Sequence, residues 1–114
     1  MTSLDKFIHV SSILRRKATG HIYFECPGCG VPHGLRIVPK DYVKAEGEQV
    51  WTWNEDVDKP TFNPSVVVNY WFGAKRESRV CHSWIKDGFI QFLDDCTHSL
   101  KGQTVSIPIW DTAD

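Results

Sequence analysis

The stretch VCHSWIKDGFIQFL, residues 80–93, decides the fold of this chain. β-Branched and aromatic residues flank the pair Asp87-Gly88, which favours the positive φ angles of tight hairpin turns. The sequence therefore predicts a β-hairpin with Lys86-Asp87-Gly88 as its connection. We expect its strands to run over 80–85 and 89–93, with Ile85 paired to Phe89.

Further short strands are predicted on both sides of this hairpin, separated by turn residues. They cover 21–24, 35–38, 50–53, 66–72 and 104–110, and Pro108 places the last one at an edge of a sheet. Residues 4–14 suit a helix or a strand equally well. We therefore expect a mainly β fold in one domain, 1–114, with 1–20 as an N-terminal extension and 21–110 as the core.

Composition excludes several classes of protein. The 114 residues are 41% hydrophobic and 24% charged, which is typical of one globular domain. The net charge of −1 gives no basic field for nucleic acid, and the patch Arg15-Arg16-Lys17 is too small to supply one. No apolar run is long enough to cross a membrane, and residues 1–6 lack a signal-peptide pattern. We expect a cytoplasmic protein.

The motif Cys26-Pro27-Gly28-Cys29-Gly30 has the spacing of a zinc knuckle. Two thiolates in a glycine-rich turn can reach one ion, and the backbone amides of the turn can point at the sulfurs. A redox-active pair has the same spacing, but it needs a helix that starts at the first cysteine. The following residues, 30–34, are poor helix formers. A zinc-ribbon-like site is therefore favoured over a redox pair.

Two further groups of potential ligands flank the predicted hairpin. Cys81-His82 lies on its first strand, and Asp95-Cys96-Thr97-His98 follows its second strand. Adjacent strand residues face opposite sides, so Cys81 and His82 are not expected to bind the same ion. The simplest site is a tetrahedral Zn²⁺ held by Cys26, Cys29, Cys81 and Cys96.

Other arrangements of these residues stay open. His82 or His98 can replace either of the later cysteines as a ligand. His33 is close enough to the knuckle to donate a hydrogen bond to it or to stand in as a ligand. Cys81 and Cys96 can also be ordinary buried thiols of the core.

Polar residues left over beside the zinc site suggest acid–base chemistry. His82 with Asp95 or His98 has the composition of a proton-transfer group, and Ser65 follows a rigid proline-containing loop that can hold a nucleophile. Each residue also has an ordinary structural interpretation, as a strand or core histidine or as a turn residue that bonds its own backbone. No GxSxG motif surrounds Ser65.

Several motifs between residues 22 and 107 resemble a family of small phage and prophage proteins. They include the knuckle and the segments 60–65, 81–85, 87–93 and 95–98, which occur in the same order. Genome annotations often label this family "ammonia monooxygenase". That label conflicts with the sequence, because ammonia oxidation uses a large membrane copper enzyme and this chain has thiol-rich metal chemistry and no membrane span.

The same family is distantly similar to suspected peptidases encoded beside bacterial ubiquitin-like conjugation genes. The shared pattern maps onto Cys26, Pro60, Thr61, Pro64, Ser65, His82, Trp84 and Ile85. The relatives often have a cysteine three residues before the histidine, where this chain has Arg79. The resemblance implies functional roles for His82 and Ser65.

The sequence thus leads to a zinc-binding β domain with two candidate functions. The first is a hydrolase of amide or peptide bonds, in which His82 with Asp95 or His98 moves protons and Ser65 or a metal-bound water attacks. The second is a non-catalytic module with a structural zinc and a tryptophan-lined face. The partner is a protein substrate in the first case and a host protein in the second.

Overall fold

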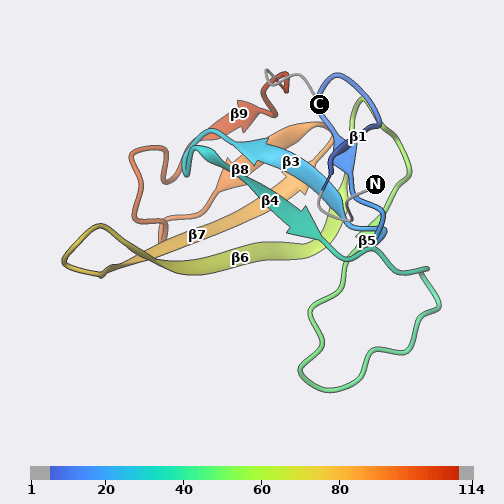
Figure 1. Ribbon diagram of the computed structural model, residues 1–114, viewed down its shortest axis with the longest axis horizontal. Helices are drawn as coiled ribbons and strands as arrows, with labels where there is room; N and C mark the ends of the chain where they lie inside the picture. Colours follow the sequence, from blue (N-terminus) through green and yellow to red (C-terminus); the bar gives the residue numbers. More distant parts are fainter. Residues whose placement is uncertain (1–5, 111–114) are drawn as a thin grey trace.

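The computed structural model describes residues 6–110, which form nine strands and no helix (Figure 1). The first four strands make one antiparallel sheet in chain order. They are β1 (Ile8–His9), β2 (Arg15–Arg16), β3 (Ile22–Cys26) and β4 (Val31–Leu35). The helix alternative near the N-terminus is therefore wrong for its described part. The expected extension, 1–20, contributes β1 and β2 to this sheet and buries Ile13 and Leu14.

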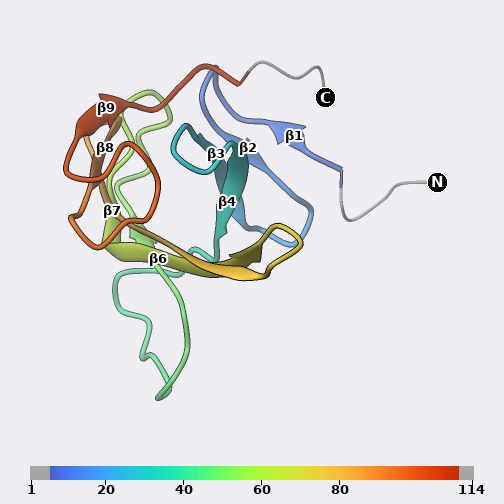
Figure 2. The ribbon, with the colours of Figure 1, turned by 90° about the vertical axis from the view of Figure 1, so that its left-hand side faces the viewer.

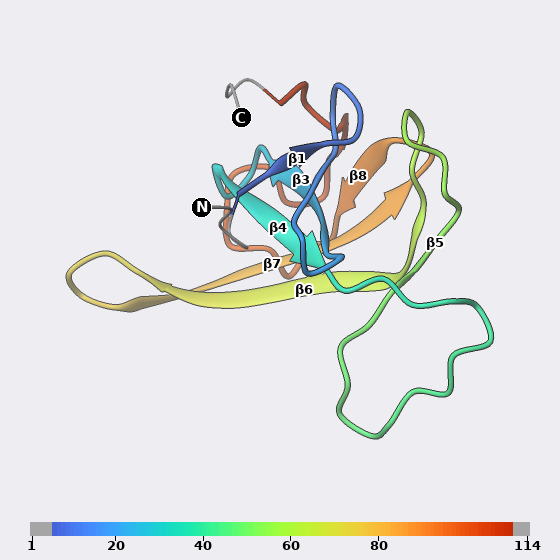
Figure 3. The same ribbon diagram turned by 45° about the vertical axis from the view of Figure 1, so that its right-hand side comes forward.

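The other five strands make the second antiparallel sheet, again in chain order. They are β5 (Thr52–Trp53), β6 (Phe62–Phe72), β7 (Glu77–Lys86), β8 (Phe89–Phe92) and β9 (Thr104–Ser106). The far end of the long β6–β7 hairpin projects beyond the rest of the molecule (Figures 1 and 3). The last strand is shorter than expected, and it ends before Pro108.

A two-residue turn joins β7 to β8. Asp87 and Gly88 have φ angles of 51° and 83°, as a tight hairpin turn requires. Lys86 pairs with Phe89, so the register differs by one residue from the expected pairing of Ile85 with Phe89. The reason is that the turn uses two residues where three were expected.

The core lies between the two sheets, which face each other (Figure 2). Alternate residues of each strand point inward, as the pleat dictates. Phe24 and Leu35 from the first sheet and Phe62, Ile85 and Phe92 from the second are almost completely buried. The fold is mainly β, and its likeness to a zinc ribbon stays a prediction.

A long loop, residues 36–51, leaves the first sheet and returns to the second (Figure 3). Its ends are joined by a bridge between Ile37 and Trp51. Within it, the Glu48 carboxylate accepts hydrogen bonds from the Tyr42 hydroxyl, the Ala45 amide and the Arg36 guanidinium, at 2.8–2.9 Å. One side chain thus holds the loop in shape. No helix in 6–110 has the length and apolarity needed to cross a membrane.

Candidate active site and metal centre

Strand β7 carries candidate site residues on both of its faces. Cys81, Ser83 and Ile85 point into the core and are about 1% exposed. His82 and Trp84 alternate with them and point to the outer face of the sheet. The strand therefore separates two groups of residues that are neighbours in sequence.

On the inner side, three sulfurs and one imidazole converge. The ligand atoms of Cys26, Cys29, Cys81 and His98 all lie within 4.8 Å of one another. The Sγ atoms of Cys26 and Cys81 are 3.8 Å apart. A tetrahedral ion with metal–sulfur bonds of ~2.3 Å has sulfur–sulfur edges of ~3.8 Å. The geometry of these residues thus fits a tetrahedral metal ion.

The pKa values of the clustered thiols are also consistent with a cation site. Contacts with the Cys26 and Cys81 thiols lower the pKa of Cys29 well below its ordinary value. The Cys26 and Cys29 sulfurs raise the pKa of Cys81 far above its ordinary value, because they disfavour a second thiolate beside the first. A bound cation would remove this competition, since it stabilises every thiolate at once.

The hairpin between β3 and β4 builds the first half of the cluster. Its turn is closed by a hydrogen bond from the Gly30 amide to the Cys26 carbonyl, 2.8 Å. The turn continues into a strand and not into the helix that a redox pair needs. All four cysteines are free thiols, so Cys26 and Cys29 form no disulfide.

His98, and not Cys96, completes the cluster, which corrects the simplest ligand set. The His98 ring packs so closely on the knuckle that a Cβ at Gly28 would collide with it. Its Nε2 atom is buried and has no hydrogen-bond partner among the described residues. Gly28 leaves room for the His98 ring, so the glycine was a sign in the sequence that a large side chain packs on the knuckle. Glycine is common in CxxC turns for other reasons, so it did not point to His98 by itself.

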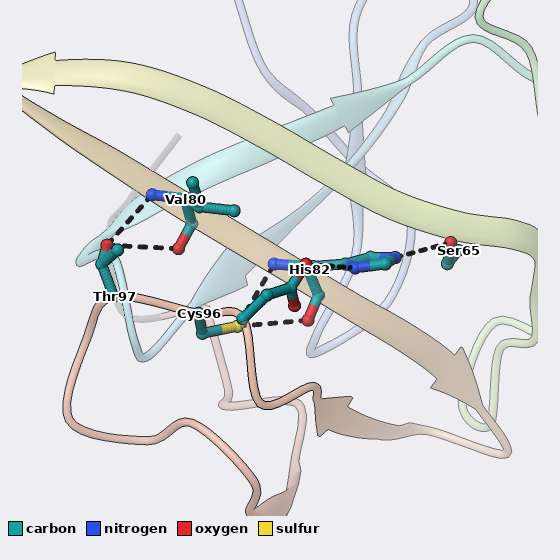
Figure 4. A network of polar contacts seen from close by, with 6 residues as sticks. Ser65, Val80, His82, Cys96 and Thr97 are labelled. Atoms are coloured by element: carbon teal, nitrogen blue, oxygen red, sulfur yellow. Dashed lines mark hydrogen bonds and ion pairs between the residues drawn. The ribbon is translucent and has the colours of Figure 1, made fainter.

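Cys96 instead fixes the backbone of β7. Its thiol donates to the His82 carbonyl and its sulfur accepts the His82 amide, both at 3.2 Å (Figure 4). The neighbouring Thr97 hydroxyl bonds the Val80 amide and carbonyl in the same way, at 3.0 and 3.3 Å. Cys96 and Thr97 therefore hold the segment after β8 against β7, at His82 and Val80. The sequence analysis did not predict this role for Cys96.

His33 supports the knuckle from the first sheet, as its position in the sequence suggested. Its side chain is buried against Phe24. Burial lowers the pKa of His33, but the sulfurs of Cys26 and Cys29 outweigh it and raise the pKa to about 9.

On the outer side of β7, a serine, a histidine and an aspartate form a chain of hydrogen bonds. Ser65 Oγ lies 3.0 Å from His82 Nε2, and His82 Nδ1 lies 3.0 Å from Asp95 Oδ2. Figure 4 shows His82 reaching from β7 toward Ser65 on β6. The side chains of His82 and Asp95 are 24% and 59% exposed, so the chain is open to solvent.

An irregularity in β6 sets the position of Ser65. The β6–β7 register shifts between Phe62 and Val66. Such bulges re-aim a side chain beside a functional site. The Trp51 indole N–H also donates to the Ser65 carbonyl, 3.3 Å, and so holds the strand at Ser65.

Segment 95–98 divides its residues between the two sites. Asp95 bonds His82 on the outer side, whereas His98 joins the sulfurs on the inner side. The structure therefore brings together Ser65, His82 and Asp95 of the four residues considered for catalysis. It places His98 apart from them.

One comparison with known proteins gives a result. A family model described as "Bacterial ubiquitination-like system serine protease (BubE)" matches residues 3–93 of the 114. This match confirms the resemblance to peptidases of ubiquitin-like systems. Phage origin stays a prediction. No curated protein and no solved structure matches the chain.

Proposed function

Because the chain belongs to the BubE family of serine proteases of bacterial ubiquitination-like systems, we propose that it hydrolyses peptide bonds through Ser65. One observation carries the proposal: the hydrogen-bonded chain from Ser65 through His82 to Asp95. Nucleophile, base and orienting carboxylate in this order are the parts of a serine hydrolase, which are recognised by geometry on any fold.

Each residue has a definite role in the proposed reaction. The Asp95 carboxylate accepts a hydrogen bond from the Nδ1–H of His82, which leaves the Nε2 lone pair directed at Ser65. As Ser65 Oγ attacks the carbonyl carbon, its proton moves to Nε2. His82 then gives that proton to the leaving amine as the C–N bond breaks, and an ester to Ser65 remains. Water, deprotonated by His82, cleaves the ester and restores the serine.

We propose further that the inner cluster holds Zn²⁺ and that its role is structural. Three thiolates and one imidazole are a common zinc donor set, and four protein ligands close the coordination sphere. A closed sphere has no position for a reacting water. The ion stabilises the junction of β3, β7 and the segment after β8, and thereby the strand that carries His82.

A fluorophosphonate probe tests the nucleophile directly. It reacts with activated serines, so intact-protein mass spectrometry is expected to show one adduct, which peptide mapping assigns to Ser65. Ser65→Ala is expected to abolish labelling and to reduce peptide hydrolysis by about a thousandfold or more.

Ser83→Ala is the matched control, because Ser83 is buried on the opposite face of β7. That variant is expected to label like the wild type. A folded protein that reacts nowhere contradicts the proposal and favours a non-catalytic module that binds a protein partner. An adduct at another serine contradicts the assignment of the nucleophile to Ser65.

A further inference from the structure

Beside Ser65 the surface is hollowed between β6 and the loop 36–51. A small cleft of about 140 Å³, here called the Ser65 cleft, has a lining that includes Lys44, Glu48, Trp51, Pro64, Ser65 and Val67. It shares several wall residues with an adjoining pocket of about 420 Å³, here called the Trp84 pocket. The shared residues are Lys44, Val50, Trp51 and Pro64. The two hollows therefore adjoin in one depression of the surface, and Ser65 lines its smaller part.

We propose that this depression binds an extended polypeptide segment of the substrate, with a large apolar side chain in the Trp84 pocket and an acidic residue beside it. The inference rests on the proposed function, since it takes Ser65 as the point of cleavage. It adds the chemical class of substrate that the site selects. Three independent features of the described residues carry it.

The first feature is the apolar wall of the pocket. Trp84 is 38% exposed and lies two residues from His82 on the same face of β7. Val50, Trp51 and Pro64 add to the apolar lining. A pocket of this size and lining accepts a large aliphatic or aromatic side chain. Its contact with the Ser65 cleft puts that side chain within a few residues of the bond attacked.

The second feature is the edge of β6. Strand β5 pairs with β6 only at Phe62 and Asn63. No other described strand pairs with that edge. The Ser65 carbonyl is bonded to the Trp51 indole, and from Val66 to the hairpin end no strand covers the edge. An extended peptide can add to an open edge through backbone hydrogen bonds. The edge opens beside Ser65, which favours a polypeptide over a small molecule.

The third feature is charge. Lys40 and Lys44 line the Trp84 pocket, and no aspartate or glutamate does. The ion pairs found in 6–110 involve neither lysine. Glu48, which borders the Ser65 cleft, is already paired with Arg36. A substrate carboxylate beside the apolar residue therefore meets uncompensated positive charge.

Cleavage of a mixed peptide library tests the proposal. Peptides from a digested bacterial proteome are incubated with the full chain, and the new termini are identified by mass spectrometry, with Ser65→Ala as the blank. Cleavage sites are expected to be enriched for Phe, Leu, Met, Tyr or Trp at one position within two residues of the bond. An acidic residue is expected next to that position.

Synthetic peptide pairs then assign each preference to a wall of the pocket. The wild type is expected to cleave a peptide with Phe at the selected position at least about tenfold faster than its Ala counterpart. Trp84→Ala is expected to reduce that ratio several-fold. Trp71→Ala is the control, because Trp71 lies on the outer face, 65% exposed, and lines neither hollow.

Charge reversal provides a result that misfolding cannot imitate. Lys44→Glu is expected to shift the preference from an acidic to a basic neighbour, whereas Lys75→Glu in the hairpin turn leaves it unchanged. Sites without an apolar preference, or a Lys44→Glu profile equal to the wild type, overturn the inference.

Fluorophosphonate labelling distinguishes a failure of the substrate preference from a failure of Ser65 as the nucleophile. If Ser65 is labelled but no library peptide is cleaved, or the cleaved sites lack these preferences, the substrate inference falls and the nucleophile stands. If Ser65 is not labelled, the proposed function falls and the substrate inference falls with it.

Discussion

Cys81 and His82 are neighbours in sequence and belong to two different sites. Cys81 is about 1% exposed and lies with two other sulfurs and an imidazole, in the core between the sheets. His82 is partly exposed and lies with a serine and a carboxylate on the outer face. One strand therefore carries a residue of the proposed metal centre on one face and a proposed catalytic residue on the other.

A small β domain can thus place a structural cluster and a reactive group of residues on opposite faces of one strand. The inner cluster is buried or half-buried and its ligand atoms lie within 4.8 Å of one another, which suits an ion that holds strands together. The outer chain is open to solvent and borders a cleft, which suits a reaction. Since strand alternation alone separates them, a change at one site is expected to leave the other site largely intact.

The largest effect is expected from breaking the inner site. Cys26→Ser removes a metal ligand, and structural zinc contributes of order 10 kcal/mol to the folding of small domains. We expect loss of the metal and of the cooperative unfolding transition, measured by elemental analysis and circular dichroism. A variant that stays folded without metal shows that the cluster does not hold the fold together.

The next effect is on the outer site alone. Asp95→Asn removes the carboxylate that orients His82, so peptide hydrolysis is expected to fall by about a hundredfold to ten-thousandfold. Metal content and the unfolding temperature are expected to match those of Asp94→Asn, the adjacent control. Equal activity of the two variants indicates that Asp95 does not orient the histidine.

Sequence analysis predicted some features of this arrangement because they follow from local rules. Strand alternation separated Cys81 from His82, and the Asp-Gly pair placed the hairpin that brings Asp95 to His82. The choice between Cys96 and His98 depended on how an irregular segment packs along β7, which no local pattern encodes. The Trp51 contact with Ser65 joins residues from two elements, and no spacing signals it.

The N-terminal segment of the fold also could not be predicted from local sequence patterns. β1 and β2 have two residues each, too few for a period of any kind. Their place in the first sheet is set by pairing with β3 and by burial of Leu14. The register of the β7–β8 hairpin differed by one residue for a related reason, since an Asp-Gly pair suits connections of more than one length.

A smaller effect is expected from substitution of Cys96, which tests whether it is a metal ligand or a hydrogen-bond partner of the His82 backbone. Cys96→Ala removes its two bonds to the His82 backbone and leaves buried polar groups unpaired. Stability is expected to fall by about 1–3 kcal/mol in denaturant unfolding, with the metal retained. Cys96→Ser, which keeps a donor and an acceptor, should lose less. Metal loss in the alanine variant would restore Cys96 as a ligand.

Trp51→Phe changes the hydrogen bond behind the nucleophile. The indole N–H donates to the Ser65 carbonyl, and loss of such a bond costs about 1 kcal/mol. We expect hydrolysis to slow several-fold, with unchanged metal content. Trp53→Phe is the control, because the Trp53 Nε1 atom has no partner among the described residues. An equal effect of both substitutions assigns the loss to packing.

The smallest effect is on the loop that borders the Ser65 cleft. The Ala45 amide, followed by Tyr42 and Arg36, lowers the pKa of Glu48. The ionised carboxylate therefore orders the loop above the ordinary carboxyl pKa, and this order is lost as the pH falls through the lowered value. Glu48→Gln is expected to speed amide exchange at Ala45 at neutral pH. Glu46→Gln should not change the exchange rate.

Native mass spectrometry of His82→Ala after fluorophosphonate treatment tests the separation of the two faces most directly, because one spectrum reports bound metal and serine adduct together. The wild type is expected to carry one zinc ion and one adduct on Ser65. The variant is expected to keep the zinc ion and to lose the adduct. A His82→Ala chain that loses its metal, or that still labels at the wild-type rate, contradicts the account.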